Sequence, residues 1–141
     1  MECKRDQFTI SNDPSRLDVD EICRFLARSY CADQRERDVI EKSIQHSLNF
    51  GVYDGETQVG FARVVSDHAT FAYLCDVFIR EDYRGNALGK WMMECIMAHP
   101  DLQGLRRWLL ATRDAHGLYS QYGFTPLSDP SVFMEIIDKT K

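Results

Sequence analysis

The sequence predicts an α/β domain in which helices cover both faces of a mixed, mostly antiparallel central sheet. Residues 50 to 79 resemble consecutive strands joined by tight turns, whereas the segments before and after them carry apolar residues at helical spacing. The expected order of elements is β-α-α-β-β-β-α-β-α-β. Such an order is typical of one sheet packed between helices.

The first fifty residues predict one strand and two helices. Residues 8 to 10 form the strand, and the first helix is indicated by four apolar residues at helical spacing, Val19, Ile22, Cys23 and Leu26. A second helix is expected from about residue 35 to residue 47. Its charged side chains are explained by a solvent-exposed face, and they are Arg35, Glu36, Arg37, Asp38, Glu41 and Lys42.

The middle of the chain predicts an antiparallel meander. The pair Asp54-Gly55 separates two strand-like segments, residues 50 to 53 and 58 to 65, and this is a strong hairpin signal. A second turn leads into a long, largely buried strand from Thr70 to Ile79. These strands therefore form the centre of the predicted sheet.

The last third predicts two more helices and two more strands. One helix is indicated by Leu88, Trp91, Met92, Cys95 and Ile96, and His99-Pro100 ends it. A short strand follows at residues 105 to 110, then a short helix at 115 to 122 that Gly123 closes as a left-handed cap. The final strand is expected at residues 132 to 137.

Length and composition limit the class of protein. The 141 residues suit a single domain, residues 1 to 141, and the formal net charge of -5 argues against a nucleic-acid binder. No stretch reaches the ~20 apolar residues that a membrane helix needs, and the N-terminus does not resemble a signal peptide, so we expect no membrane association and a cytoplasmic location. The five cysteines form no C-x-x-C pair, which argues against a disulfide framework or a metal site.

Residues 84 to 90, Arg-Gly-Asn-Ala-Leu-Gly-Lys, form a loop of small residues between a strand and a helix. The start of a helix presents backbone N–H groups with partial positive charge, which suits a phosphate. Gly85, Ala87 and Gly89 leave room for an anion to approach the backbone, while Arg84 and Lys90 add charge. The spacing does not fit a Walker loop or a dinucleotide fingerprint. An ordinary strand-to-helix turn is the alternative explanation of the loop.

Two segments resemble motifs of the GCN5-related N-acetyltransferase (GNAT) family. Residues 84 to 89 are similar to its Arg/Gln-x-x-Gly-x-Gly/Ala loop, with Ala87 where the family usually has glycine. Residues 112 to 124 are similar to its Asn-x-x-Ala-x-x-Leu-Tyr-x-x-x-Gly-Phe pattern, with Thr112 in place of asparagine. A positive φ at Ala87 would strain the loop and weaken cofactor binding.

The resemblance implies direct transfer of an acetyl group from acetyl-CoA to a primary amine. It implies that Tyr119 is the general acid beside the departing sulfur, with core packing as the alternative role. Asp76 interrupts an apolar strand, so it is either an amine anchor or base, or part of an ion pair with an arginine such as Arg63, Arg106 or Arg113. The implied cofactor-binding residues are Val77, Phe78, Ile79, Arg84, Gly85, Asn86, Ala87, Leu88, Gly89, Lys90 and Thr112.

Two functions follow from the sequence. The first is an acetyl-CoA-dependent N-acetyltransferase that acts on the amine of a small molecule or peptide and needs no metal. The alternative is a CoA-binding sensor or partner module with weak catalysis, which the substitutions at Ala87 and Thr112 favour. A homodimer through the last strand or an exposed sheet edge is compatible with either function.

Overall fold

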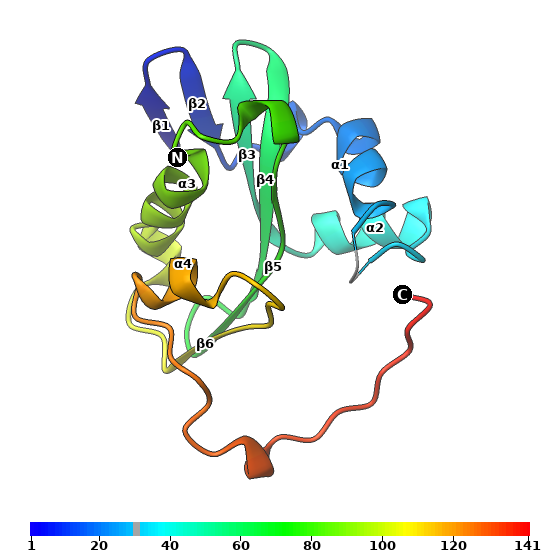
Figure 1. Ribbon diagram of the computed structural model, residues 1–141, viewed down its shortest axis with the longest axis vertical. Coiled ribbons are helices and arrows are strands. Elements are labelled where there is room, and N and C mark those ends of the chain that lie inside the picture. The colour runs from blue at the N-terminus through cyan, green and yellow to red at the C-terminus, as the bar shows by residue number, and fades with distance from the viewer. Residues whose placement is uncertain (30–31) are drawn as a thin grey trace.

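The computed structural model describes residues 1–29 and 32–141, so Cys31, one of the five cysteines discussed above, lies outside the described residues. Within the described part, six strands form one sheet in the order β1-β2-β3-β4-β5-β6 (Figure 1). The strands are β1 (Glu2–Arg5), β2 (Phe8–Ser11), β3 (Leu48–Asp54), β4 (Thr57–Ser66), β5 (Phe71–Ile79) and β6 (Arg107–Leu110). The helices are α1 (Val19–Leu26), α2 (Arg37–Gln45), α3 (Leu88–Met97) and α4 (His116–Ser120).

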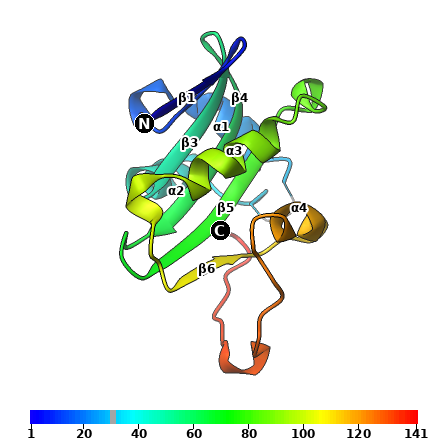
Figure 2. The same cartoon turned by 90° about the vertical axis from the view of Figure 1, so that its left-hand side faces the viewer.

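Helices cover both faces of the sheet, as predicted. Helices α1 and α2 lie on one face and α3 and α4 on the other (Figures 1 and 2). The first pair contributes Ile22, Leu26, Ile40 and Ile44 to one apolar cluster, and α3 contributes Trp91, Met92 and Ile96 to the other. Complete burial of an aliphatic side chain of this size contributes about 1.5–3 kcal/mol, so the periodic apolar residues hold the helices in place.

Four of the five strand pairs are antiparallel. The predicted hairpin at Asp54-Gly55 joins β3 to β4, and Gly55 takes the positive φ of 59° that this turn requires. Strands β5 and β6 pair in parallel, because α3 carries the chain across one face of the sheet between them. The mixed, mostly antiparallel sheet is therefore confirmed.

The structure corrects the predicted order of elements at both ends. Strand β1 was not predicted; it pairs with β2 through a turn in which Asp6 has a φ of 53°, and three of its four residues are charged and exposed, as suits an edge strand. The strand predicted at residues 132 to 137 is wrong for the chain described here. Residues 130 to 132 form the 3-10 turn η4, and the following residues are extended but belong to no strand.

The physical reason for the missing strand is that an apolar run requires burial but does not specify a partner. Every residue from 125 to 141 is exposed, and this segment runs away from the sheet (Figure 1). A strand forms where its backbone N–H and C=O groups pair with a partner strand. In the described part of the chain, residues 132 to 137 do not pair with β6. None of the helices among residues 1–29 and 32–141 is long and apolar enough to cross a membrane.

Candidate active site

A cleft opens where β5 and β6 separate. The two strands pair from Phe71 and Arg107 as far as Leu74 and Leu110, after which β5 continues to Ile79 without β6 beside it. The cleft has a volume of about 430 Å³. Its walls come from β5, the end of β6, α1 and α4, and the residues include Phe25, Arg28, Leu74, Asp76, Val77, Arg84, Leu110, Thr112, Asp114 and Tyr119.

A β-bulge at Asp76 causes the separation of the strands. On the β4 side, Phe61 pairs with Phe78 and Arg63 pairs with Cys75, so two residues of β5 face one residue of β4. Asp76 takes a φ of 53°, which few residues other than glycine adopt, although aspartate does so more readily than most. A bulge bends its strand and increases the local twist, which turns the end of β5 away from β6.

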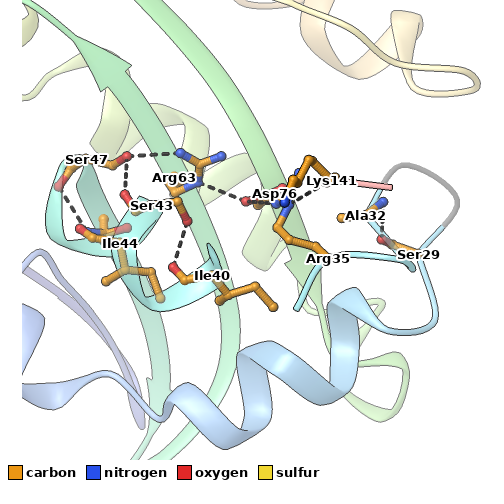
Figure 3. Close-up of polar contacts among 11 residues, drawn as sticks. Ser29, Ala32, Arg35, Ile40, Ser43, Ile44, Ser47, Arg63, Asp76 and Lys141 are labelled. Carbon is orange, nitrogen blue, oxygen red and sulfur yellow. Dashed lines mark hydrogen bonds and ion pairs between the residues drawn. The ribbon is translucent and has the colours of Figure 1, made fainter. Parts of the chain in front are cut away.

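The Asp76 side chain is held by two arginines (Figure 3). Arg35 donates from Nη1 to Oδ1 and Oδ2 at 3.1 and 3.0 Å, and Arg63 donates from Nε to Oδ2 at 2.9 Å. Arg63 also donates from Nη1 to the Ser47 hydroxyl at 3.1 Å. The Asp76 side chain is 4% exposed. Of the two roles predicted for Asp76, the ion pair with Arg63 is therefore present.

Arg35 is a residue of this ion-pair cluster that the sequence analysis missed. It was expected on a solvent-exposed helix face, but α2 begins after it, at Arg37, and its side chain is 16% exposed. Its Nε donates to the Lys141 carbonyl oxygen at 2.9 Å (Figure 3). Periodicity could not have identified it, because a single arginine outside the helix adds no pattern.

The end of β5 presents one open backbone edge to the cleft. Phe78 and Ile79 pair with β4 on one side, whereas β6 has already ended on the other. Phe78 is buried and stacks on Phe25 of α1, with ring centroids 4.0 Å apart. The edge from Val77 to Ile79 can therefore accept an extended ligand as an added strand, in which the Ile79 carbonyl already accepts a hydrogen bond from Arg84 Nε at 3.4 Å.

The loop that follows turns twice before α3 begins. Gly85 and Ala87 both have positive φ, 92° and 57°. Ala87 is the residue that precedes the helix, and no side chain caps the N–H groups of the first turn. Arg5 donates instead to the carbonyl oxygens of Asn86 and Ala87, each at 3.3 Å, so it holds the other side of the loop. The N–H groups of α3 are left for an anion.

The residues of this loop differ in what they can offer a ligand. A Cβ added at Gly89 would meet no atom within 4 Å, so the space beside the helix start is open. Arg84 and Lys90 are exposed, whereas Leu88 is buried and can contribute its backbone alone. Asn86 donates its side-chain amide to the Tyr83 carbonyl at 2.9 Å and so shapes the turn.

Tyr83 anchors the turn before the loop to the body of the protein. Its hydroxyl donates to the Asp54 carboxylate at 2.8 Å, at the end of β3. This hydrogen bond to the neutral phenol raises the pKa of Tyr83 above its ordinary value. The loop is thus fixed at Tyr83 on one side and at Arg5 on the other.

Thr112 and Tyr119 form the opposite wall of the cleft. The Thr112 hydroxyl accepts from the Ala115 N–H at 3.1 Å and so helps to start α4. Tyr119 is buried, and its ring meets that of Phe124 edge to face with centroids 6.0 Å apart. The structure therefore brings Tyr119 to the same cleft as Asp76 and Arg84, although these residues are far apart in sequence.

Known proteins share both this sequence pattern and this fold. Residues 45–126 match the family model described as the acetyltransferase (GNAT) domain. The chain belongs to the GNAT acetyltransferase family. A candidate acetyltransferase of Gibberella zeae is 31% identical over an alignment 140 residues long. The alignment covers 83% of this chain and 78% of the relative.

Solved structures share this fold. A candidate acetyltransferase of the family from Xanthomonas campestris pv. campestris is 46% identical, with a TM-score of 0.93 and 97% of each chain covered. A crystal structure of an acetyltransferase from Clostridium acetobutylicum, described with acetyl-CoA, is 11% identical, with a TM-score of 0.65 and coverage of 92% of this chain and 94% of that chain. This more distant likeness shows the fold alone.

Proposed function

We propose that this GNAT protein transfers an acetyl group from acetyl-CoA directly to a primary amine of a small molecule or peptide. The observation that carries the proposal is that one cleft is lined by both Arg84, at the anion-binding loop, and Tyr119, a buried acid. A phosphate at one end of a bound molecule and a reacting group at the other end would need this arrangement. The described residues therefore suit a long, phosphorylated acyl donor.

The residues present fit acetyl-CoA. Its pyrophosphate would face the uncapped N–H groups of α3, where Gly89 leaves open space and Arg84 and Lys90 carry positive charge. Its pantetheine arm would lie along the free edge of Val77, Phe78 and Ile79 and end near Thr112. Acetyl-CoA supplies the activated acetyl thioester.

The side chains of the cleft would then act on the acceptor and the leaving group. The amine nitrogen attacks the thioester carbon, the new N–C bond forms, and the C–S bond breaks. The attacking amine must first lose a proton, which passes to solvent water in the open cleft, because its ordinary pKa is about 10. The departing sulfur gains a proton, or a hydrogen bond, from the Tyr119 hydroxyl, since a thiolate is costly in a partly dry cleft.

We assign Asp76 a positioning role in this reaction. Both of its carboxylate oxygens accept hydrogen bonds from guanidinium groups, so the side chain is engaged before any substrate arrives. The ion pairs hold the bulge that separates β5 from β6, and the bulge makes the cleft. An amine anchored at Asp76, the role considered from the sequence, would have to share the carboxylate with both guanidinium groups.

A second function, CoA binding with weak catalysis, is favoured by one observation. Ala87 has the positive φ that glycine adopts without strain, so the loop is less well suited to its ligand than a glycine loop would be. The two functions differ in turnover rather than in binding. An enzyme releases free CoA when an acceptor amine is added, whereas a sensor binds CoA without releasing thiol.

A thiol-release assay with acetyl-CoA and a panel of amines tests the proposal. We expect turnover with at least one amine and a loss of about 100-fold or more in kcat for Tyr119→Phe, because the general acid is removed. Tyr53→Phe is the control, since it deletes a buried hydroxyl on β3 that has no hydrogen-bond partner among the described residues. If CoA binds tightly but no amine gives turnover, the chain is a binding module.

A further inference from the structure

The C-terminal arm, residues 128 to 141, is exposed although its middle, residues 132 to 137, is rich in large apolar side chains. Residues 132 to 137 are Val-Phe-Met-Glu-Ile-Ile. Met134 is 97% exposed, Ile136 105% and Ile137 62%. Figures 1 and 2 show the arm leaving the body of the protein beyond β6 and curving back only at its end. A cluster of large exposed apolar side chains at one site indicates a surface that is buried in an assembly.

A vacant slot lies beside β6 in the same chain. Two cavities of about 330 and 340 Å³ lie between β6 and the segment from residue 122 to residue 127, and Phe133 of the same chain lines the first of them. They share walls formed by Trp108, Leu109, Phe124 and Leu127. Because β6 pairs with β5 along one edge, its other edge faces this slot. An extended segment fills such a slot by adding a strand, with apolar side chains in the cavities.

The chain directs its own arm away from the slot. Asp129 begins the turn η4 by accepting hydrogen bonds from the Ser131 N–H and hydroxyl, and Arg107 lies over the Phe133 ring at 4.9 Å. Beyond Phe133 the arm departs, and its end meets Arg35 on the far side. One chain thus carries both a strand-like arm and an unfilled place for a strand.

We propose that residues 134 to 137 of one chain insert into the slot of a second copy, which returns its own arm in the same way, while Val132 and Phe133 stay on their own chain. In a two-fold symmetric exchange, each exposed arm becomes buried and each open edge of β6 gains a partner strand. The result is a closed dimer rather than a fibre. The Lys and Asp residues at 138, 139 and 141 would remain at the surface. The partner that this arm fits is therefore the same protein.

The exchange would complete the active site, a consequence that rests on the proposed function. The second cavity of the slot is lined by Thr112 and Tyr119 as well as by β6. Tyr119 and Thr112 also line the catalytic cleft. An inserted arm would therefore pack behind the wall that positions the general acid, and a single chain would lack that support.

Molecular mass in solution tests the exchange without any assay of activity. The full chain should elute with a mass about twice 16.4 kDa by light scattering. Ile136→Lys/Ile137→Lys should halve this mass. Neighbouring residues of a strand point to opposite faces, so one of the two lysines would enter the apolar slot whichever face the strand turns toward it. The control, Ala69→Lys/Thr140→Lys, adds the same charge at exposed positions and should remain a dimer. A wild-type mass of one chain, or a dimer that tolerates Ile136→Lys/Ile137→Lys, would overturn the proposal.

A hybrid dimer distinguishes exchange from an arm that folds back into its own slot. Ile136→Lys/Ile137→Lys and Tyr119→Phe chains, each inactive alone, are co-expressed with different tags and purified through both. In the exchange, the intact arm of the Tyr119→Phe chain enters the slot of the other chain, so about half of the wild-type activity per dimer should return because one of two sites is complete. A purified hybrid that stays inactive would refute the exchange. If the wild type itself is inactive, the mass measurements still decide it.

Discussion

Two residues other than glycine have left-handed backbone in the candidate site, Asp76 in the cleft and Ala87 in the loop before α3, and they are supported in opposite ways. Asp76 has a φ of 53° and Ala87 a φ of 57°. The side chain of Asp76 is buried between Arg35 and Arg63, so the fold itself maintains the conformation. The methyl group of Ala87 makes no comparable contact, and its backbone precedes a helix start that no side chain caps.

The difference separates a structural site from a ligand site. At Asp76, polar groups of the chain satisfy one another, and the result is a fixed bulge that shapes the cleft. At Ala87, the chain leaves donors unsatisfied and space open, which is useful when a ligand supplies the missing acceptors. Substitutions at the first site should therefore act on stability, and substitutions at the second should act mainly on binding.

The largest effect is expected from Asp76→Asn. This change keeps the shape of the side chain but removes the charge between two partly buried guanidinium groups, which should lower the free energy of unfolding by about 3 kcal/mol. Urea denaturation measures it. Asp82→Asn is the matched control, because Asp82 forms an exposed ion pair with Arg80 and should change stability by less than about 1 kcal/mol. Equal effects at the two positions would show that the Asp76 cluster does not hold the bulge.

An intermediate effect is expected from Gly89→Val. The added side chain should enter the open space beside α3 and displace the phosphate, which weakens acetyl-CoA binding about 10- to 100-fold if one charge-assisted hydrogen bond is lost. Titration calorimetry measures the affinity, and the unfolding free energy should change little because the new Cβ meets no atom of the protein. Gly117→Val in α4 offers equally open space away from the loop and should bind normally. Unchanged affinity for Gly89→Val would place the phosphates elsewhere.

The smallest effect is expected from Ala87→Gly. Removing the methyl group from a left-handed residue should stabilise the protein by about 1 kcal/mol and keep or improve acetyl-CoA affinity. Thermal unfolding and calorimetry measure the two quantities. The same substitution at the other end of α3, Ala98→Gly, should have the opposite sign, since Ala98 has a φ of -91° and glycine there adds freedom to the unfolded chain. A destabilised Ala87→Gly variant would contradict the assigned strain.

The antiparallel centre of the fold could be predicted because its signals are local. The pair Asp54-Gly55 favours a hairpin wherever it lies between strand-like segments, and the spacing of Leu88, Trp91 and Met92 favours a helix with one apolar face. The loop of small residues before α3 was also recognisable, since glycine and alanine before a helical pattern indicate a tight turn into a helix. The sign of φ at Ala87, however, followed from the path of the chain rather than from its residue type.

Contacts between distant segments could not be predicted in the same way. Arg35 contacts Asp76 across 41 positions of the sequence, and no periodicity connects them. Strand β1 was missed because its charged residues suit an edge, which pairs through its backbone and needs no apolar pattern.

The sequence alone determined where this protein has its helices, its central hairpin, a loop of small residues before α3 and the Tyr119 motif, because each depends on the preferences of neighbouring residues. The tertiary structure decided that Asp76 forms an ion pair with Arg63 and that β6 ends beside the cleft while β5 continues. It also decided that residues 132 to 137 remain outside the sheet. The physical reason is that an apolar or charged side chain specifies the kind of partner it needs. Which partner it meets depends on the path of the whole chain.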